Sequence, residues 1–248
     1  MAKFRKIFFV HIPKCAGSTV YSHIARHIPE RWWDKLLKRR KHTIVRTRFH
    51  NAAIETRIVK ARQSKFISGH FDNATLFKME PHINDFIFTF LRSPESRLRS
   101  AYRFFCSNQG WRWIDLPGHW SDYSYEDYLR LDSHNQRAAI DNAIVRQLGG
   151  ELIQSVEDEH TWLQWVDIGF AALKNMQYVG FQHRFSDDLD EVCRRPGLPH
   201  FSGANKNISQ NQGEFDISTV AENLESQKTR WDRVLYERAL AEFCKDTK

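Results

Sequence analysis

The chain has 248 residues, of which 41% are hydrophobic and 27% are charged, so it is long enough and apolar enough to fold as one domain and is not a disordered chain. No apolar run approaches the roughly 18 to 20 residues that a membrane-spanning helix needs, which argues against a membrane-spanning protein. Lys and Arg number 37 against 30 Asp and Glu, and the net charge of +7 indicates an anionic partner without identifying it.

The N-terminal part of the chain is predicted to form a strand, a tight loop and a helix. Residues 4–10 (FRKIFFV) are apolar and β-prone, and they end at His11-Ile12-Pro13, a pattern typical of a buried strand. Gly17 and Ser18 then open a run with helical spacing that continues to Ala25. Two further strands are predicted over residues 65–68 and 85–91.

The strand at 85–91 (DFIFTFL) runs into a second predicted helix. Pro94 suits the first position of this helix and Ser93 suits its N-cap. Apolar side chains follow at helical spacing, at Leu98, Ala101, Tyr102 and Phe105. The sequence therefore contains a second unit of strand, turn and helix.

The rest of the chain is predicted to be mainly helical. The expected helices span residues 125–131, 135–148, 157–174, 187–194 and 231–243, and a late strand spans 177–181. Residues 196–214 are rich in Gly, Pro and Asn, which predicts an irregular loop. Strands that alternate with helices predict a single α/β domain over residues 1–248, with a mostly parallel central sheet flanked by helices.

A candidate anion site lies between the first strand and the first helix. Backbone N–H groups and the helix dipole favour an anion there, Lys14 adds a positive charge, and Gly17 permits close approach of a ligand. The Walker pattern GxxxxGK(S/T) places its Lys after the second Gly, whereas Lys14 precedes Gly17, which disfavours an ordinary Mg-nucleotide triphosphatase. The alternative is an ordinary turn with a solvated lysine.

A second candidate phosphate site combines Arg92 and Ser100. Arg92 closes the strand at 85–91 and offers a planar fork to a phosphate, and Ser100 offers a hydroxyl donor eight residues later. Either residue alone is weak evidence, because an arginine at a strand end is commonly an ordinary surface residue.

Together the two segments resemble the motifs of sulfotransferases that use 3′-phosphoadenosine 5′-phosphosulfate (PAPS). Residues 13–19 (PKCAGST) resemble the 5′-phosphosulfate loop, and residues 92–102 (RSPESRLRSAY) resemble the 3′-phosphate motif, particularly as found in the carbohydrate branch that includes heparan sulfate 2-O-sulfotransferase. The resemblance implies a fold like that of P-loop-containing nucleotide hydrolases.

Three further stretches extend the resemblance, which runs from about residue 4 to the final helix. These are residues 66–71 (FISGHF), 141–150 (DNAIVRQLGG, similar to a stretch near the acceptor side) and 178–185 (YVGFQHRF, with His183 where the family commonly has Glu). Residues 30–64 lie outside the resemblance and are interpreted as a basic insertion. Between residues 31 and 65 there are twelve basic and two acidic residues.

The resemblance implies a PAPS-dependent O-sulfotransferase with 3′,5′-ADP as its product and no metal. It implies that Arg92 and Ser100 anchor the 3′-phosphate, that His70 is the general base, and that Lys206, in the loop at 196–214, closes over the phosphosulfate. His11 is a rival for the role of base, although its position suggests that it orders the loop. The groups expected to hold the 5′-phosphosulfate are those of Lys14, Cys15, Ala16, Gly17, Ser18 and Thr19, with Lys14 also acting in catalysis.

The acceptor is expected to be a hydroxyl compound, and a saccharide is the expected class. The sequence identifies neither the particular acceptor nor the oligomeric state. The basic segment at 31–65 is a candidate to bind an acidic saccharide, or is a solvated helix face. Aromatic side chains that either stack on the acceptor or belong to the core are Trp111, Trp113, Trp120, Tyr123 and Tyr125.

Two other classes of protein compete with a sulfotransferase. A P-loop nucleotide kinase is disfavoured because Asp85 precedes its strand, whereas a Walker-B aspartate ends one. A non-catalytic polyanion or nucleic-acid binder would use the basic segment at 31–65. The leading interpretation involves no nucleic-acid partner.

The cysteines and the N-terminus bear on cellular location. Cys15, Cys106, Cys193 and Cys244 lie far apart without a Cys-x-x-Cys pair, which predicts free thiols and argues against a structural zinc site. The apolar stretch at 7–10 is too short for a secretory signal, so we expect a cytoplasmic protein.

Overall fold

The computed structural model describes residues 4–28, 42–46, 53–106, 122–132, 138–150, 155–156, 158–201 and 217–244, with residues 42–46 and 53 described by their backbone alone. The chain divides into two compact units. The first comprises residues 1–91 and 174–208, and the second comprises residues 92–173 and 209–248. The single domain over residues 1–248 stays a prediction.

A five-stranded parallel sheet forms the centre of the first unit, with the strand order β2-β3-β1-β4-β5. Val10 lies beside Gly69 and Thr89, so β1, β3 and β4 reach the same carboxyl edge of the sheet. The α/β fold class with a parallel central sheet is therefore confirmed. The strands are β1 (Ile7–Val10), β2 (His42–Arg46), β3 (Phe66–His70), β4 (Phe86–Leu91) and β5 (Tyr178–Phe181).

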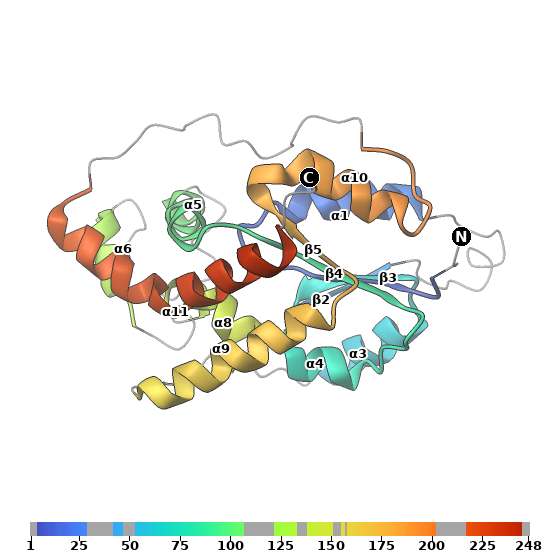
Figure 1. Cartoon of the computed structure of the whole chain (residues 1–248), viewed down its shortest axis with the longest axis horizontal. Coiled ribbons are helices and arrows are strands. Elements are labelled where there is room, and N and C mark those ends of the chain that lie inside the picture. The colour runs from blue at the N-terminus through green and yellow to red at the C-terminus, as the bar shows by residue number, and fades with distance from the viewer. Residues whose placement is uncertain are drawn as a thin grey trace. The chain divides into compact units, whose positions relative to one another are not determined.

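Helices cover both faces of this sheet (Figure 1). α1 (Gly17–His27) and α10 (Phe185–Arg194) lie on one face, and α3 (Ala53–Gln63) and α4 (Asn73–Lys78) lie on the other. This cover by helices agrees with the sequences of the central strands, because β1 (IFFV) and β4 (FIFTFL) are almost entirely apolar and all four residues of β1 are buried. The short 3-10 helix Gln182–Arg184 links β5 to α10.

The basic segment contributes regular structure to the first unit, although the sequence analysis assigned no strand or helix to it. β2 is an edge strand that pairs with β3, and α3 follows it. β2 is the stretch HTIVR, which has a basic residue at each end and only two aliphatic residues. Its composition therefore does not predict a strand. Edge strands of natural sheets are often short and carry charged residues, which discourage pairing with another chain.

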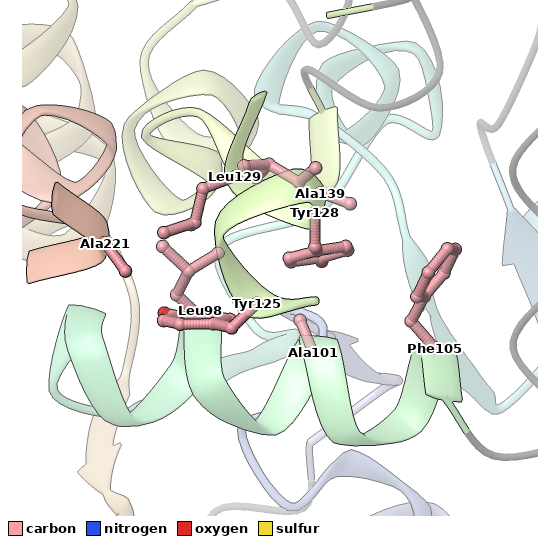
Figure 2. Close-up of a cluster of buried hydrophobic side chains, with 9 residues drawn as sticks. Leu98, Ala101, Phe105, Tyr125, Tyr128, Leu129, Ala139 and Ala221 are labelled. Atoms are coloured by element: carbon pink, nitrogen blue, oxygen red, sulfur yellow. The ribbon is translucent and has the colours of Figure 1, made fainter. Parts of the chain in front are cut away.

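The second unit is helical in the residues that the structure describes, and α11 packs against α5, α6 and α8. A buried cluster lies between α5 and α6, with Ala221 of α11 at its end (Figure 2). Tyr128 and Phe105 contact within it, with ring centroids 5.1 Å apart. The helices are α5 (Pro94–Cys106), α6 (Tyr125–Arg130), α8 (Ala143–Leu148), α9 (Glu159–Lys174) and α11 (Thr219–Phe243).

Two sequence predictions about these helices are wrong. A continuous helix over residues 135–148 is interrupted at Asp141 and Asn142, and α8 begins only at Ala143. Asn142 has a left-handed backbone (φ 45°), and its Oδ1 accepts hydrogen bonds from the N–H groups of Trp231 (2.8 Å) and Asp232 (3.2 Å). These long-range bonds override local helix propensity.

The last helix also begins earlier than the apolar pattern predicted, at Thr219 instead of residue 231. Ser218 caps it, because its side chain accepts a hydrogen bond from the N–H of Ala221. The first turns of α11 are mostly polar, so periodicity alone could not find them.

Asp232 of α11 anchors the start of α8 from a fully buried position. Its carboxylate accepts hydrogen bonds from the N–H groups of Ile144 (3.1 Å) and Val145 (2.8 Å), which have no partner inside their own helix. Nε of Arg97, also fully buried, lies 4.0 Å from the same carboxylate. Burial raises the pKa of Asp232 to about 6. Asp232 therefore joins α5, α8 and α11.

Candidate active site

The loop between β1 and α1 has an unusual backbone. Lys14 (φ 68°) and Ala16 (φ 61°) both adopt the left-handed conformation, which is uncommon outside glycine. Strained backbone of this kind clusters at ligand sites, and left-handed residues in tight loops form the N–H concavities that bind anions. The N–H of Cys15 donates to the carbonyl of Ile12 (3.3 Å), which closes the turn.

The start of α1 is suited to an anion. Its N-cap residue Ala16 makes no side-chain capping bond, and its first turn carries no acidic residue. The positive end of the helix dipole is therefore not offset by a local carboxylate. Ser18 is exposed, whereas Thr19 is buried and its N–H donates to the carbonyl of Ala16 (3.1 Å), so the N–H groups of Gly17 and Ser18 are the better candidates to hold a phosphate.

His70 lies at the end of β3, next to the residue that opens the loop. Its Nδ1 donates a hydrogen bond to the carbonyl of His11 (2.8 Å), and the two imidazole centroids are 4.2 Å apart. The N–H of His11 in turn donates to the carbonyl of Gly69 (2.9 Å). The first unit thus brings together the predicted base and the start of the predicted phosphosulfate loop.

Gly17 has a role that the sequence analysis missed. A Cβ atom placed on Gly17 would lie 1.8 Å from Nε2 of His11, so the imidazole of His11 occupies the space in which a larger residue would put its side chain. The sequence offered close approach of a ligand as the reason for this glycine. The contact with His11 joins residues on either side of the loop, which a motif read along the chain does not reveal.

Arg92 and Ser100 belong to the second unit. Arg92 directly follows β4, Ser100 lies on α5, and both are partly exposed. Arg97, from the same motif, is fully buried, and its Nη1 donates to the carbonyl of Ala139 (3.0 Å). Within the motif, Arg97 therefore packs inside the second unit, whereas Arg92 and Ser100 are partly exposed.

Of the two roles left open for the aromatic side chains, Tyr125 has the one in the core. Tyr125 is only 5% exposed, and its hydroxyl donates to Glu225 (2.5 Å). Burial raises the pKa of this hydroxyl, so Tyr125 is a core residue in its protonated form. Tyr123 is partly buried against the same cluster. The remaining candidates Trp111, Trp113 and Trp120, and the candidate Lys206, lie outside the described residues.

The stretch at 141–150 is mainly structural. Arg146 is buried, forms an ion pair with the carboxylate of Asp141, and donates from Nε to the carbonyl of Asp141 (2.8 Å). Its guanidinium lies over the ring of Trp162 at 4.8 Å. A Cβ on Gly149 would lie 1.8 Å from the carbonyl oxygen of Trp165, so this glycine permits close packing of α8 against α9.

Two described cations of the basic segment, Lys65 and Arg62, lie at the amino edge of the sheet, whereas the backbone of Arg46 lies beside His70 in the register of β2 and β3. Lys65 directly precedes β3 and His70 ends it, so the strand separates the two residues by about 16 Å at about 3.3 Å per residue. Arg62 forms an ion pair with Glu80 (2.8 Å). These cations at the amino edge of the sheet therefore do not surround the predicted base.

Asp85 is also at the amino edge. Arg5 holds its carboxylate with two hydrogen bonds of 3.0 Å, and although burial alone would raise the pKa of Asp85, these bonds and one from the N–H of His82 lower it. A Walker-B carboxylate ends its strand, so this structural ion pair argues further against the kinase alternative.

No group of three or more His, Cys, Asp or Glu side chains is placed to hold a metal ion within the described part of the chain. In the same residues, no helix is both long and apolar enough to cross a membrane.

A parallel α/β sheet whose central strand leads into a tight loop and the start of a helix is an arrangement that α/β proteins often use to bind phosphate groups. The chain belongs to the sulfotransferase family, because the model of that family matches residues 1–239. This match includes residues 30–64, which the motifs had left outside the resemblance. The chain is therefore a sulfotransferase and its general reaction is sulfuryl transfer.

Solved structures of sulfotransferases are also similar to this chain. One is mouse sulfotransferase SULT7A1 complexed with PAP, with 15% identity, a TM-score of 0.47, and coverage of 94% of this chain and 88% of that one. Another is a sulfotransferase from Alicyclobacillus acidocaldarius, with 14% identity, a TM-score of 0.46, and coverage of 99% and 98%. No curated protein matches the chain significantly.

Proposed function

We propose that the chain is a PAPS-dependent O-sulfotransferase that acts on a saccharide hydroxyl, with His70 as general base. The observation that carries this proposal is the juxtaposition of His70 with the loop that contains the left-handed residues Lys14 and Ala16, in a chain of the sulfotransferase family. The carbohydrate acceptor rests on the resemblance of residues 13–19 and 92–102 to the carbohydrate branch.

The residues fit the proposed co-substrate. Lys14 and the N–H groups of Gly17 and Ser18 would hold the 5′-phosphosulfate, at a helix start that carries no acidic residue. Arg92 and Ser100 would hold the 3′-phosphate, which distinguishes PAPS from ATP. Lys206 is proposed to close over the phosphosulfate.

In the proposed reaction, the acceptor oxygen attacks sulfur in line with the bond to the leaving phosphate. A new S–O bond to the acceptor forms as the S–O bond to the phosphate breaks, and the hydroxyl proton moves to Nε2 of His70. Lys14 stabilises the negative charge that develops on the leaving phosphate. No metal takes part in this scheme.

Substitution of His70 tests the assignment of the base. We expect His70→Gln to lower turnover by about 10²- to 10⁴-fold, because no group then accepts the hydroxyl proton. The dissociation constant for 3′,5′-ADP, measured by calorimetry, should stay within about threefold of wild type, since His70 does not hold the nucleotide. His82→Ala is a matched control, because His82 is an exposed histidine of the same unit. Near-normal turnover of His70→Gln, with turnover abolished in His11→Ala, would assign the base to His11.

A thermal-shift series tests the nucleotide and separates the competing classes. We expect 3′,5′-ADP to raise the melting temperature, because a ligand at 100 times its Kd stabilises the folded state by about 2.7 kcal/mol. Neither ATP with Mg²⁺ nor a random oligonucleotide should match this shift. Stabilisation by Mg-ATP alone would support a kinase, and stabilisation by the oligonucleotide alone would support a polyanion binder. Labelled PAPS with saccharide, phenol and alcohol acceptors then tests the acceptor class.

A further inference from the structure

His11 contacts both halves of the candidate site, although the proposed reaction gives it no chemical step. It follows β1, and its ring packs against Phe9 on one side, with a centroid distance of 5.2 Å, and against His70 at 4.2 Å. Its N–H donates to the carbonyl of Gly69, so its backbone is fixed to the end of β3. His11 therefore lies in a defined position.

The carbonyl of His11 determines which nitrogen of His70 carries the proton. A carbonyl oxygen only accepts hydrogen bonds, so Nδ1 of His70 must be the donor in the 2.8 Å contact. In a neutral imidazole the other nitrogen is then the acceptor. The contact selects the Nδ1–H tautomer, in which Nε2 is the basic atom.

The imidazole of His11 fills the space beside Gly17. A Cβ atom on any larger residue at position 17 would lie only 1.8 Å from Nε2 of His11. Gly17 is the first residue of α1, and its N–H is one of the groups proposed to hold the 5′-phosphate. The ring of His11 therefore packs directly against the proposed phosphate site.

We propose that His11 is a positioning residue that couples the base to the phosphosulfate loop. Its carbonyl holds His70 in the Nδ1–H tautomer, and its imidazole holds the start of α1 in the conformation that binds the 5′-phosphate. This inference rests on the proposed function and adds a residue to it.

A double-mutant cycle between His11 and Gly17 tests whether the imidazole of His11 holds the start of α1 in the conformation that binds the 5′-phosphate. Gly17→Ala retains the backbone N–H but places its Cβ against the ring, so it should weaken 3′,5′-ADP binding by about tenfold, as should His11→Ala. In the His11→Ala background the ring is gone, so adding Gly17→Ala should cost less than about threefold more. Binding of 3′-AMP, which lacks the 5′-phosphate, should be unchanged in all three variants and serves as a check on their folding.

An additive cycle in a chain that binds 3′,5′-ADP would overturn the role of the His11 ring, and so would an equal loss of 3′-AMP binding. A wild-type chain that binds neither nucleotide would overturn the proposed function itself. The tautomer has its own test, which is nitrogen NMR of the wild-type chain, with His70→Gln used only to assign the signal. It should show neutral His70 protonated at Nδ1. Protonation at Nε2 would overturn the role of the His11 carbonyl.

Discussion

Replacement of Lys14 by Met should lower turnover with PAPS by about 10²- to 10³-fold, the loss expected when one preorganised group that stabilises transition-state charge is removed. Met has a similar length and lacks the charge. It meets the same backbone strain, because Lys14 already has φ 68° without being a glycine. The effect of this substitution therefore reports on charge, and steady-state kinetics with saturating acceptor measures it.

Lys14→Gly separates the effect of Lys14 on turnover from its effect on the stability of the protein. Glycine adopts the left-handed region without the cost of about 1–2 kcal/mol that other residues carry, so this variant should melt at a higher temperature than wild type while losing turnover as Lys14→Met does. Lys60→Met is the matched control, since Lys60 is an exposed lysine of α3 in the same unit, and it should keep wild-type turnover. Equal losses in Lys60→Met and Lys14→Met would mean that general surface charge matters and that Lys14 has no special role.

Asp232→Ala should destabilise the second unit by about 3–5 kcal/mol, because it leaves the buried cation of Arg97 without its carboxylate partner. The N–H groups of Ile144 and Val145 also lose their acceptor. At about 2–4 °C per kcal/mol, the melting temperature should fall by roughly 10 °C. Asp167→Ala is the matched control, because Asp167 pairs with Arg238 at the exposed surface and should cost less than about 1 kcal/mol.

A second substitution identifies the cause of this loss. Arg97→Met in the Asp232→Ala background removes the unneutralised cation, so the double variant should regain part of the lost stability. No recovery would assign the whole loss to α8 and its N–H groups. Circular dichroism during thermal unfolding measures the stability of wild type, Asp232→Ala, Asp167→Ala and the double variant.

The pH dependence of stability follows from the same carboxyl group. Because burial raises its pKa from 3.8 to about 6, the folded state binds a proton more tightly than the unfolded state. Relative to Asp232→Asn, the wild-type free energy of unfolding should therefore rise as the pH falls from 6 to 4 and then level off. A difference that shrinks over this range would contradict the assignment.

Much of the first unit could be predicted because its signals are local. The apolar runs that became β1 and β4, and Pro94 at the first position of α5, each lie within a few residues of the element they define. β2 was not predicted, because this edge strand is short and has few apolar residues. The break at Asn142 escaped because its cause is a pair of hydrogen bonds to residues almost ninety positions away.

The candidate site divides in the same way. The motifs named Lys14, Gly17 and His70 by their position after strands, and the structure places all three in the first unit. The packing of His11 against Gly17 depends on how the chain folds back after β1, and no residue pattern encodes it. The sequence left two roles open for Tyr125, stacking on the acceptor or packing in the core, and the structure places it in the core with its hydroxyl on Glu225.

The direction of β1 has a practical consequence for handling the protein. The ion pair of Arg5 and Asp85 lies beside the start of β1, at the amino edge of the sheet. His11 and the loop follow the end of β1, at the opposite edge. The first described residues therefore lie at the edge of the sheet opposite Lys14 and His70. We expect an affinity tag attached at the amino-terminal end to leave the loop accessible to nucleotides in the binding experiments described above.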